Sequence, residues 1–348
     1  MTDDGSSFLQ ACRREPVSRT PVWFMRQAGR SLPEYRELRG QGSILEAVRD
    51  PEIAIEATCQ PVRRYGVDAA ILFSDIMVPL AATGFGVEIE PGKGPIVREP
   101  IRTSSDLRRL RPFDPSEAPY LTETVRGVVN EVDVPLIGFA GAPFTLASYL
   151  VEGGPSRDHV RTKALMHTDE KTWFVLCDYL AETTVTALRS QIAAGASAIQ
   201  LFDSWSGSLS PSDYERFALP STKRIFEEIA SLGVPRIIFG VGTGELLELM
   251  ATSGAEVIGV DWRIPLDRAA ARVGREIALQ GNLDPALCVA GYEPAATAAR
   301  LVLEAGKKAA AHIFNLGHGV FPETNPEVLR GLVELVHSAS VDERLGDR

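Results

Sequence analysis

Short apolar runs rich in branched and aromatic residues alternate with longer helical patterns along most of the chain. This alternation is typical of βαβ units, in which parallel strands are joined by helices. Eight runs are present, and eight alternations predict a closed (β/α)8 barrel. The runs are VWFM (22–25), AAILF (69–73), PLIGFA (135–140), AIQLF (198–202), RIIFGV (236–241), EVIGV (256–260), IALQG (277–281) and HIFNL (312–316).

The segments between the runs carry helical periodicity. In residues 169–195 apolar side chains recur every three or four positions, and residues 244–254 end on a glycine, which favours helix termination. Residues 84–117 are the main excursion, because GVEIEPGKGPIVREPI reads as two strands around a Pro/Gly-rich turn. We therefore predict a hairpin inserted between the second and third strands of the barrel.

The length of 348 residues fits either two average domains or one large barrel. No break in composition separates the alternations. The predicted fold class is therefore α/β, a single (β/α)8 TIM barrel over residues 8–340, with residues 1–7 and 341–348 as flexible termini.

Composition and charge narrow the possible partners. The chain is 45% hydrophobic and 24% charged, and no stretch approaches the ~18 apolar residues of a membrane helix. The N-terminus starts with acidic residues and lacks the features of a secretory signal, so we predict a cytoplasmic protein. Acidic residues number 46 against 36 Lys and Arg, which argues against nucleic acid as a partner. An anionic ligand would need cations gathered locally.

Polar residues and glycines stand just past the ends of the predicted strands. In a (β/α)8 barrel these positions share one face, where such enzymes place their chemistry. The alternative is that any loop begins with polar residues. The positions are Arg26, Asp75, Gly141, Asp203, Gly242, Asp261, Asn282 and His318.

Two arginines and an aspartate are the strongest candidates among them. Arg26 and Arg30 follow a predicted strand, and paired guanidinium groups suit the bidentate binding of carboxylates or phosphates. The alternative is a solvated basic loop paired with Glu34 and Glu37. Asp75 could bind N–H groups, hold a cation or act as an acid or base, but most such aspartates cap helices.

Three further segments contain candidate polar side chains. GFAGAPFTLASYLVEGGPS combines small residues, which permit close approach of a ligand, with Tyr149. LFDSWSGSLSP offers Ser204 beside an aromatic residue, without the motif of a nucleophilic serine. His318 lies between Gly317 and Gly319, which indicates an accessible hydrogen-bonding or proton-handling group. Zinc is disfavoured, because the cysteines are far apart and no His-x-x-x-His pair is present.

Taken together, five segments resemble the hallmark segments of the uroporphyrinogen decarboxylase family in order and spacing. The resemblance runs from about residue 8 to residue 335 and implies a homodimer without metal or organic cofactor. It implies removal of four acetate carboxyl groups of uroporphyrinogen III as CO2, giving coproporphyrinogen III in haem and tetrapyrrole biosynthesis. The segments are FMRQAGRSLPEYRELR, FSDIMVP, GAPFTLASYLVEGG, LFDSWSGSLSP and NLGHGVFP.

The resemblance also implies roles for individual residues. Arg26 and Arg30 match arginines that bind substrate carboxylates, and Arg39 matches a further basic residue near the cleft. Asp75 matches the aspartate that gathers pyrrole N–H groups. The remaining matches are polar positions at Tyr149, Ser204 and His318 and cleft-lining positions at Phe73 and Gly141.

These residue types suit a decarboxylation without a cofactor. A pyrrole protonated at a ring carbon becomes its own electron sink when CO2 leaves. We expect Asp75 to stabilise that cation and Arg26, or water held by it, to deliver the proton, with His318 and Tyr149 as alternative donors. Two other functions stay open, namely a zinc-dependent methyltransferase on the same barrel and a non-catalytic tetrapyrrole-binding protein.

Overall fold

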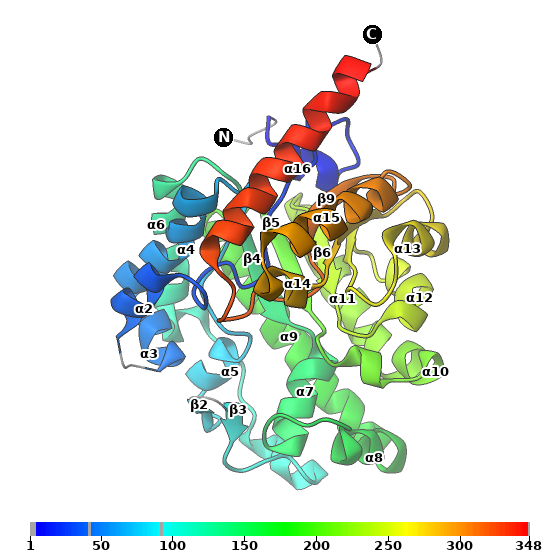
Figure 1. Ribbon diagram of the computed structural model, residues 1–348. Coiled ribbons are helices and arrows are strands. Elements are labelled where there is room, and N and C mark those ends of the chain that lie inside the picture. Colours follow the sequence, from blue (N-terminus) through cyan, green and yellow to red (C-terminus); the bar gives the residue numbers. More distant parts are fainter. Residues whose placement is uncertain (1–4, 41–42, 91–92, 347–348) are drawn as a thin grey trace.

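A curled parallel sheet forms the centre of the molecule (Figure 1), in a computed structural model that describes residues 5–40, 43–90 and 93–346. Seven strands pair in the order β1-β4-β5-β6-β7-β8-β9, and every pair is parallel. They coincide with the last seven predicted runs. The strands are β1 (Ala70–Ile71), β4 (Leu136–Gly141), β5 (Ala198–Phe202), β6 (Arg236–Phe239), β7 (Val257–Gly259), β8 (Ala278–Leu283) and β9 (His312–Leu316).

The first predicted run lies between the two edge strands of this sheet. Val22 forms a parallel bridge with Phe314 of β9, and the Trp23 N–H donates to the Phe314 carbonyl at 3.3 Å. On the other side the Asp68 N–H, just before β1, donates to the Val22 carbonyl at 2.8 Å. The predicted (β/α)8 fold is confirmed, although VWFM contributes a single bridge instead of a full strand.

Buried polar side chains span the interior of the barrel. The Trp23 indole N–H donates to Gln280 of β8, and the Gln280 amide donates to Gln200 of β5, both at 2.9 Å. All three side chains are fully buried, so each bond satisfies a group that would otherwise be costly to bury. This chain of bonds links the first run to opposite parts of the sheet.

Helices cover the outside of the sheet and follow the predicted periodicity. The longest begins after Asp169, whose carboxylate accepts the Thr172 N–H at 3.1 Å, and ends before Gly195. Residues 244–254 form only one short helix after a 3-10 turn. The α-helices are α1 (Ser7–Cys12), α2 (Pro33–Arg39), α3 (Ile44–Arg49), α4 (Pro51–Tyr65), α5 (Val78–Ala82), α6 (Pro119–Glu131), α7 (Pro143–Glu152), α8 (Val160–Thr168), α9 (Glu170–Ala194), α10 (Pro211–Asp213), α11 (Leu219–Ile229), α12 (Leu247–Ala251), α13 (Leu266–Val273), α14 (Pro285–Ala290), α15 (Tyr292–Gly306) and α16 (Pro326–Gly346).

A separate two-stranded antiparallel sheet interrupts the barrel between β1 and β4. It consists of β2 (Val87–Glu90) and β3 (Gly94–Val97), and residues 91–92 lie outside the described part of the chain. Figure 1 shows this hairpin beside α5, at the end of the molecule away from α16.

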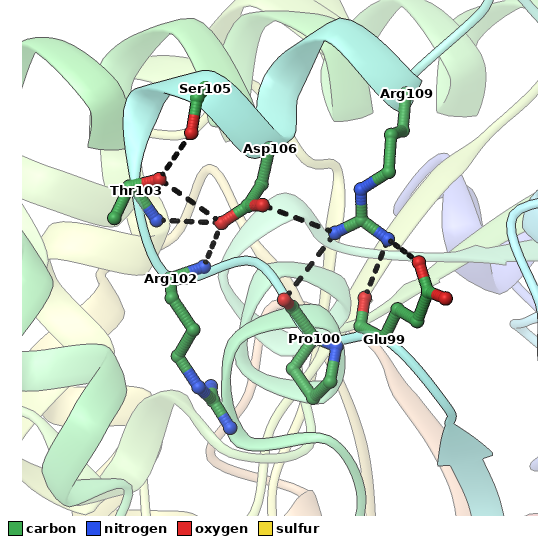
Figure 2. Close-up of polar contacts among 7 residues, drawn as sticks. All are labelled: Glu99, Pro100, Arg102, Thr103, Ser105, Asp106 and Arg109. Carbon is green, nitrogen blue, oxygen red and sulfur yellow. Dashed lines mark hydrogen bonds and ion pairs between the residues drawn. The ribbon is translucent and has the colours of Figure 1, made fainter.

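After the hairpin the chain forms a compact capped turn (Figure 2). The Asp106 carboxylate accepts the backbone N–H groups of Arg102 and Thr103 at 2.8 and 2.9 Å and so caps the 3-10 helix η1 (Ser104–Arg109). Arg109 donates to the Glu99 carbonyl oxygen at 2.9 Å. These local bonds hold the excursion in a defined shape before the chain returns to α6.

The C-terminal helix α16 is fastened to the start of the barrel. His337 on this helix and the N–H of Val22 both bond the Asp68 carboxylate at 2.8 Å, and Arg19 bonds it at 2.6 Å. The helix continues through residue 346, whereas residues 1–4 and 347–348 of the predicted flexible termini lie outside the described residues. Among the described helices, none combines the length and apolar character needed to cross a bilayer.

Candidate active site

The predicted site residues gather around a cavity of about 1530 Å³ at the C-terminal ends of the strands. Sites for drug-sized ligands usually measure about 300–1,000 Å³, so this cavity has room for a larger ligand. Eight of the nine residues predicted for substrate binding or catalysis line it. They are Arg26, Arg30, Arg39, Phe73, Asp75, Tyr149, Ser204 and His318.

Gly141 is the ninth, and it is not among the lining residues. It ends β4, where an added Cβ would lie 2.6 Å from Leu146 Cδ2 and 3.2 Å from Ile76 Cβ. Its lack of a side chain therefore lets α7 pack closely against the strand end. The structure assigns this glycine a packing role instead of the predicted place in the lining.

Two of the arginines that line the cavity, Arg26 and Arg30, have a backbone conformation that is unusual for residues with a side chain. Arg26 has a φ of 59° and Arg30 a φ of 41°, and Gly29 between them has a φ of 89°. Left-handed conformations of this kind cost about 1 kcal/mol or more each and persist only where their surroundings enforce them. The sharp turns separate the first run from α2 and bring both guanidinium groups to one cavity.

The two glycines beside His318 make room for neighbouring segments. A Cβ on Gly319 would lie 2.5 Å from Cδ and 2.8 Å from Cγ of Arg26, and a Cβ on Gly317 would overlap the backbone of Trp262. The Val320 N–H also donates to the Met25 carbonyl at 2.9 Å. The loop after β9 thus lies directly on the segment that carries Arg26.

The charges of Arg26 and Asp75 act on each other inside the cavity. The Arg26 side chain is exposed to the cavity. The surrounding walls remove part of its solvent, which lowers its pKa, while Asp75 and Tyr149 oppose the shift. Burial raises the pKa of Asp75, and the Met77 N–H at 2.9 Å and Arg26 oppose that shift. Burial and the Asp75 charge raise the pKa of Tyr149. Tyr149 therefore keeps its proton at neutral pH.

His318 is a neutral imidazole at neutral pH. Burial, followed by the positive charges of Arg26 and Arg263, lowers its pKa to about 4, although Asp261 opposes the shift. The Phe239 ring lies 6.4 Å from its ring centroid. His318 thus offers one hydrogen-bond donor and one acceptor, and it adds no charge to the arginine cluster.

Several strand-end residues in the predicted set anchor loops instead of lining the cavity. The Asp203 carboxylate accepts the Thr145 hydroxyl at 2.8 Å. Asp261 accepts the Gly242 N–H at 2.6 Å, and the Asn282 amide donates to the Asp261 carbonyl at 2.8 Å. These bonds hold the loops after β5, β6, β7 and β8 in place around the cavity.

Other lining residues escaped prediction because they do not follow a strand of the barrel. Lys93 lies on the hairpin, where it bonds Glu90 at 2.7 Å, and Arg36 lies on α2, where it donates to the Ser31 carbonyl at 3.1 Å. Phe202 is an exception, because it ends β5 but is apolar, whereas the strand-end pattern selects polar residues and glycines; it adds an apolar wall. Arg36 belongs to the same arginine-rich segment as Arg26, and that clustering is the signal that could have found it.

The cysteines form no centre of their own. Cys12, Cys59, Cys177 and Cys288 are buried free thiols on α1, α4, α9 and α14. Within the described residues, no three His, Cys, Asp or Glu side chains come together in a group able to hold a metal ion. The donor set expected of a thiol-rich zinc centre is therefore not assembled among the described residues.

The chain is a parallel α/β barrel, and a large cavity at its strand ends is lined by clustered arginines and a half-buried aspartate. Enzymes of the TIM-barrel class place their active sites at this face. Arginines clustered in this way suit an anionic ligand. The chain matches the family model described as uroporphyrinogen decarboxylase (URO-D) over residues 4–339. It belongs to the uroporphyrinogen decarboxylase family.

Individual relatives cover nearly the whole chain. A protein of Streptomyces coelicolor named uroporphyrinogen decarboxylase is 59% identical over 334 residues, spanning 96% of this chain and 94% of its own length. One of Thermobifida fusca with the same name is 57% identical over 343 residues, spanning 98% and 95%. A solved methyltransferase from Methanosarcina mazei shares the fold with a TM-score of 0.79 at 21% identity, covering 96% of this chain and 98% of that one.

Proposed function

We propose that the protein decarboxylates uroporphyrinogen III to coproporphyrinogen III by removing the carboxyl groups of its four acetate side chains as CO2. The observation that carries the proposal is that Arg26, Arg30 and Asp75 face one cavity of about 1530 Å³. Relatives named uroporphyrinogen decarboxylase at 56–59% identity support it and disfavour the methyltransferase alternative.

The cationic side chains are suited to the carboxylates of the substrate. Arg26 and Arg30 each present a planar fork that binds a carboxylate through two parallel hydrogen bonds, and Arg39 adds a third guanidinium at the cavity. Phe73 and Ser204 contribute an apolar wall and a hydroxyl group. The net charge of −10 makes this local clustering necessary, because the rest of the protein repels a polyanion.

Asp75 is suited to the charge that develops during the reaction. Protonation of a pyrrole at a ring carbon creates a cation, and the electrons of the breaking C–C bond flow into it as CO2 leaves. A fixed carboxylate beside the pyrrole stabilises that cation, and preorganised charge of this kind contributes roughly 3–4 kcal/mol. The Met77 N–H holds the Asp75 carboxylate in place at 2.9 Å.

In the proposed mechanism, the proton that the pyrrole ring carbon receives comes from Arg26 or from a water molecule held by Arg26. Partial loss of solvent inside the cavity lowers the pKa of Arg26, which makes its guanidinium a stronger acid than it is in water. Tyr149 also keeps a proton at neutral pH and is the second candidate. His318, with its pKa lowered to about 4, carries no surplus proton at neutral pH and is better suited to hydrogen bonding.

The test is anaerobic incubation with uroporphyrinogen III, followed by measurement of CO2 and of the partly and fully decarboxylated porphyrins. The wild-type protein should form coproporphyrinogen III, whereas a non-catalytic carrier would bind the substrate and release no CO2. Asp75→Ala should lower turnover by about 10²–10³-fold. Near-normal turnover by that variant would overturn the scheme.

We also propose that residues 8–340 act as one catalytic domain in a cytoplasmic homodimer of the haem pathway. The family resemblance supports this assembly. Sedimentation of the purified protein would measure its mass directly, and a monomer at micromolar concentration would contradict the dimer.

A further inference from the structure

Three aromatic rings form a stack that begins at the cavity. The Tyr149 ring of α7 lies on the indole of Trp205, with centroids 4.0 Å apart and planes tilted by 36°. The indole also contacts the His159 ring, with centroids 4.6 Å apart and planes tilted by 42°. His159 immediately precedes α8. The stack therefore joins residues from three different segments of the chain.

The backbone of Trp205 is tied to the helix that carries Tyr149. The Trp205 N–H donates to the Thr145 hydroxyl oxygen at 3.3 Å, and that hydroxyl donates to the Asp203 carboxylate at 2.8 Å. Thr145 and Asp203 are fully buried. Thr145 precedes Tyr149 by four residues, so both lie on the same face of α7. The loop after β5 is thus fixed against the helix face that presents Tyr149.

His159 has an unusual backbone conformation beside the indole. Its backbone φ is 50°, and its N–H donates to the Ser156 hydroxyl at 3.0 Å. The residue is 3% exposed, and its Nδ1 is buried without a hydrogen-bond partner among the described residues. A left-handed non-glycine residue with an unsatisfied nitrogen is costly, so hydrogen bonding does not account for its placement. Aromatic packing does, because the His159 ring lies 4.6 Å from the indole of Trp205 and, edge to face, 6.3 Å from the Phe144 ring.

Tyr149 itself depends on this packing. Its hydroxyl makes no hydrogen bond to another described residue, and yet the ring lies close enough to Arg26 and Asp75 for their charges to act on it. Stacking on Trp205 therefore determines where the hydroxyl points.

We propose that Trp205 and His159 are positioning residues, which hold the Tyr149 hydroxyl toward Arg26 and Asp75 by clamping its ring. Their effect on turnover rests on the proposed decarboxylase function. A displacement of about 1 Å at a reacting group can lower a rate by about 100-fold, which sets the scale of the effect.

The test is a double-mutant cycle on kcat and KM for uroporphyrinogen III, comparing wild type, Trp205→Ala, Tyr149→Phe and the double variant. Trp205→Ala should lower kcat by about 10- to 100-fold with little change in KM. In the Tyr149→Phe background, where the hydroxyl is already gone, the same change should cost less than about threefold. A full, independent loss in both backgrounds would overturn the proposal.

Conservative variants separate stacking from simple destabilisation. Trp205→Phe and His159→Phe keep an aromatic ring and should restore most of the kcat lost in Trp205→Ala and His159→Ala. His167→Ala, which removes an exposed histidine at the end of the same helix α8, should leave kcat unchanged. If Trp205→Ala does not fold, the test uses the two variants His159→Ala and His159→Phe. Equal kcat values for these two variants would overturn the proposal.

The two proposals fail in different ways. Absence of CO2 release by the folded wild-type protein would contradict the decarboxylase function. In that case the affinity for uroporphyrin III is measured for the same four proteins of the double-mutant cycle by quenching of protein fluorescence. Loss of affinity in Trp205→Ala that disappears in the Tyr149→Phe background supports the clamp, and equal losses in both backgrounds overturn it.

Discussion

The side chain of Arg26 crosses the loop after β9 at Gly319, where an added Cβ would lie 2.5 Å from Arg26 Cδ. The position of the cavity arginine therefore depends on the absence of a side chain almost 300 residues further along the chain. Gly319 has no left-handed φ, so an alanine there would strain contacts and not its own backbone.

Gly319→Ala should accordingly displace Arg26 and lower kcat/KM by about 10- to 100-fold, because a shift of about 1 Å in a positioned group has effects of that size. The melting temperature should change little. Gly244→Ala is the matched control, since that glycine also follows a barrel strand but an added Cβ meets nothing within 4 Å. A normal kcat/KM in Gly319→Ala would contradict the prediction, because it would mean that the Arg26 side chain accommodates the added methyl group without losing its position.

Arg30→Lys keeps the charge at the cavity but removes the planar fork. Loss of one charge-assisted hydrogen bond costs about 1.5–3 kcal/mol, which corresponds to about a 10- to 100-fold drop in kcat/KM. Steady-state kinetics would measure this drop. Arg189→Lys, at an exposed ion pair with Glu228, should behave like wild type. Equal kcat/KM for Arg30→Lys and wild type would mean that charge alone suffices.

His312 should make the protein less stable in mild acid. Burial lowers its pKa to about 4, and its bond to the Gly281 carbonyl opposes the shift. The unfolded chain, with an ordinary pKa near 6.5, takes up a proton as the pH falls below that value, and the folded protein does not. This histidine's contribution is therefore present above pH 6.5 and is lost as the pH falls toward 4.

Urea unfolding of wild type and His312→Gln at pH 7 and pH 5 would measure that contribution. The wild-type free energy of unfolding should fall by up to about 2 kcal/mol more than that of the variant between the two pH values. His167→Gln, which changes an exposed histidine, should follow the wild type. An identical pH dependence for His312→Gln and wild type would contradict the assignment.

Asp68→Asn should destabilise the fold without affecting the chemistry. The Asp68 carboxylate bonds the Val22 N–H, Arg19 and His337, which joins the first run, the sheet and α16. Loss of its charge should lower the free energy of unfolding by about 1.5–3 kcal/mol. Denaturation in urea would measure this loss. The kcat of folded protein at 25 °C should stay normal, because Asp68 is not among the residues lining the cavity.

Much of the fold was predictable because it depends on local patterns. Apolar runs of five or six residues must be buried on both faces, so seven of them became neighbouring parallel strands. VWFM differed, since the chain turns at Gln27, whose N–H bonds the Phe24 carbonyl at 3.0 Å, before a ladder can extend. The expectation that polar residues past the strand ends share one face also located the cavity. It could not distinguish residues that line the cavity from residues that anchor loops, such as Asp203 and Asp261.

The sequence by itself determined the alternation of strands and helices, the family, and the residues Arg26, Arg30 and Asp75 as the cationic and anionic candidates for the site. Only the tertiary structure decided what each neighbour does. Gly319 leaves room for Arg26, and Trp205 packs against Tyr149. Burial, and then the charge of Arg26, lowers the pKa of His318 so that it is neutral at neutral pH. Such roles arise where segments distant in the chain come within a few ångströms, and neither steric fit nor the loss of solvent around a charge is encoded in local periodicity.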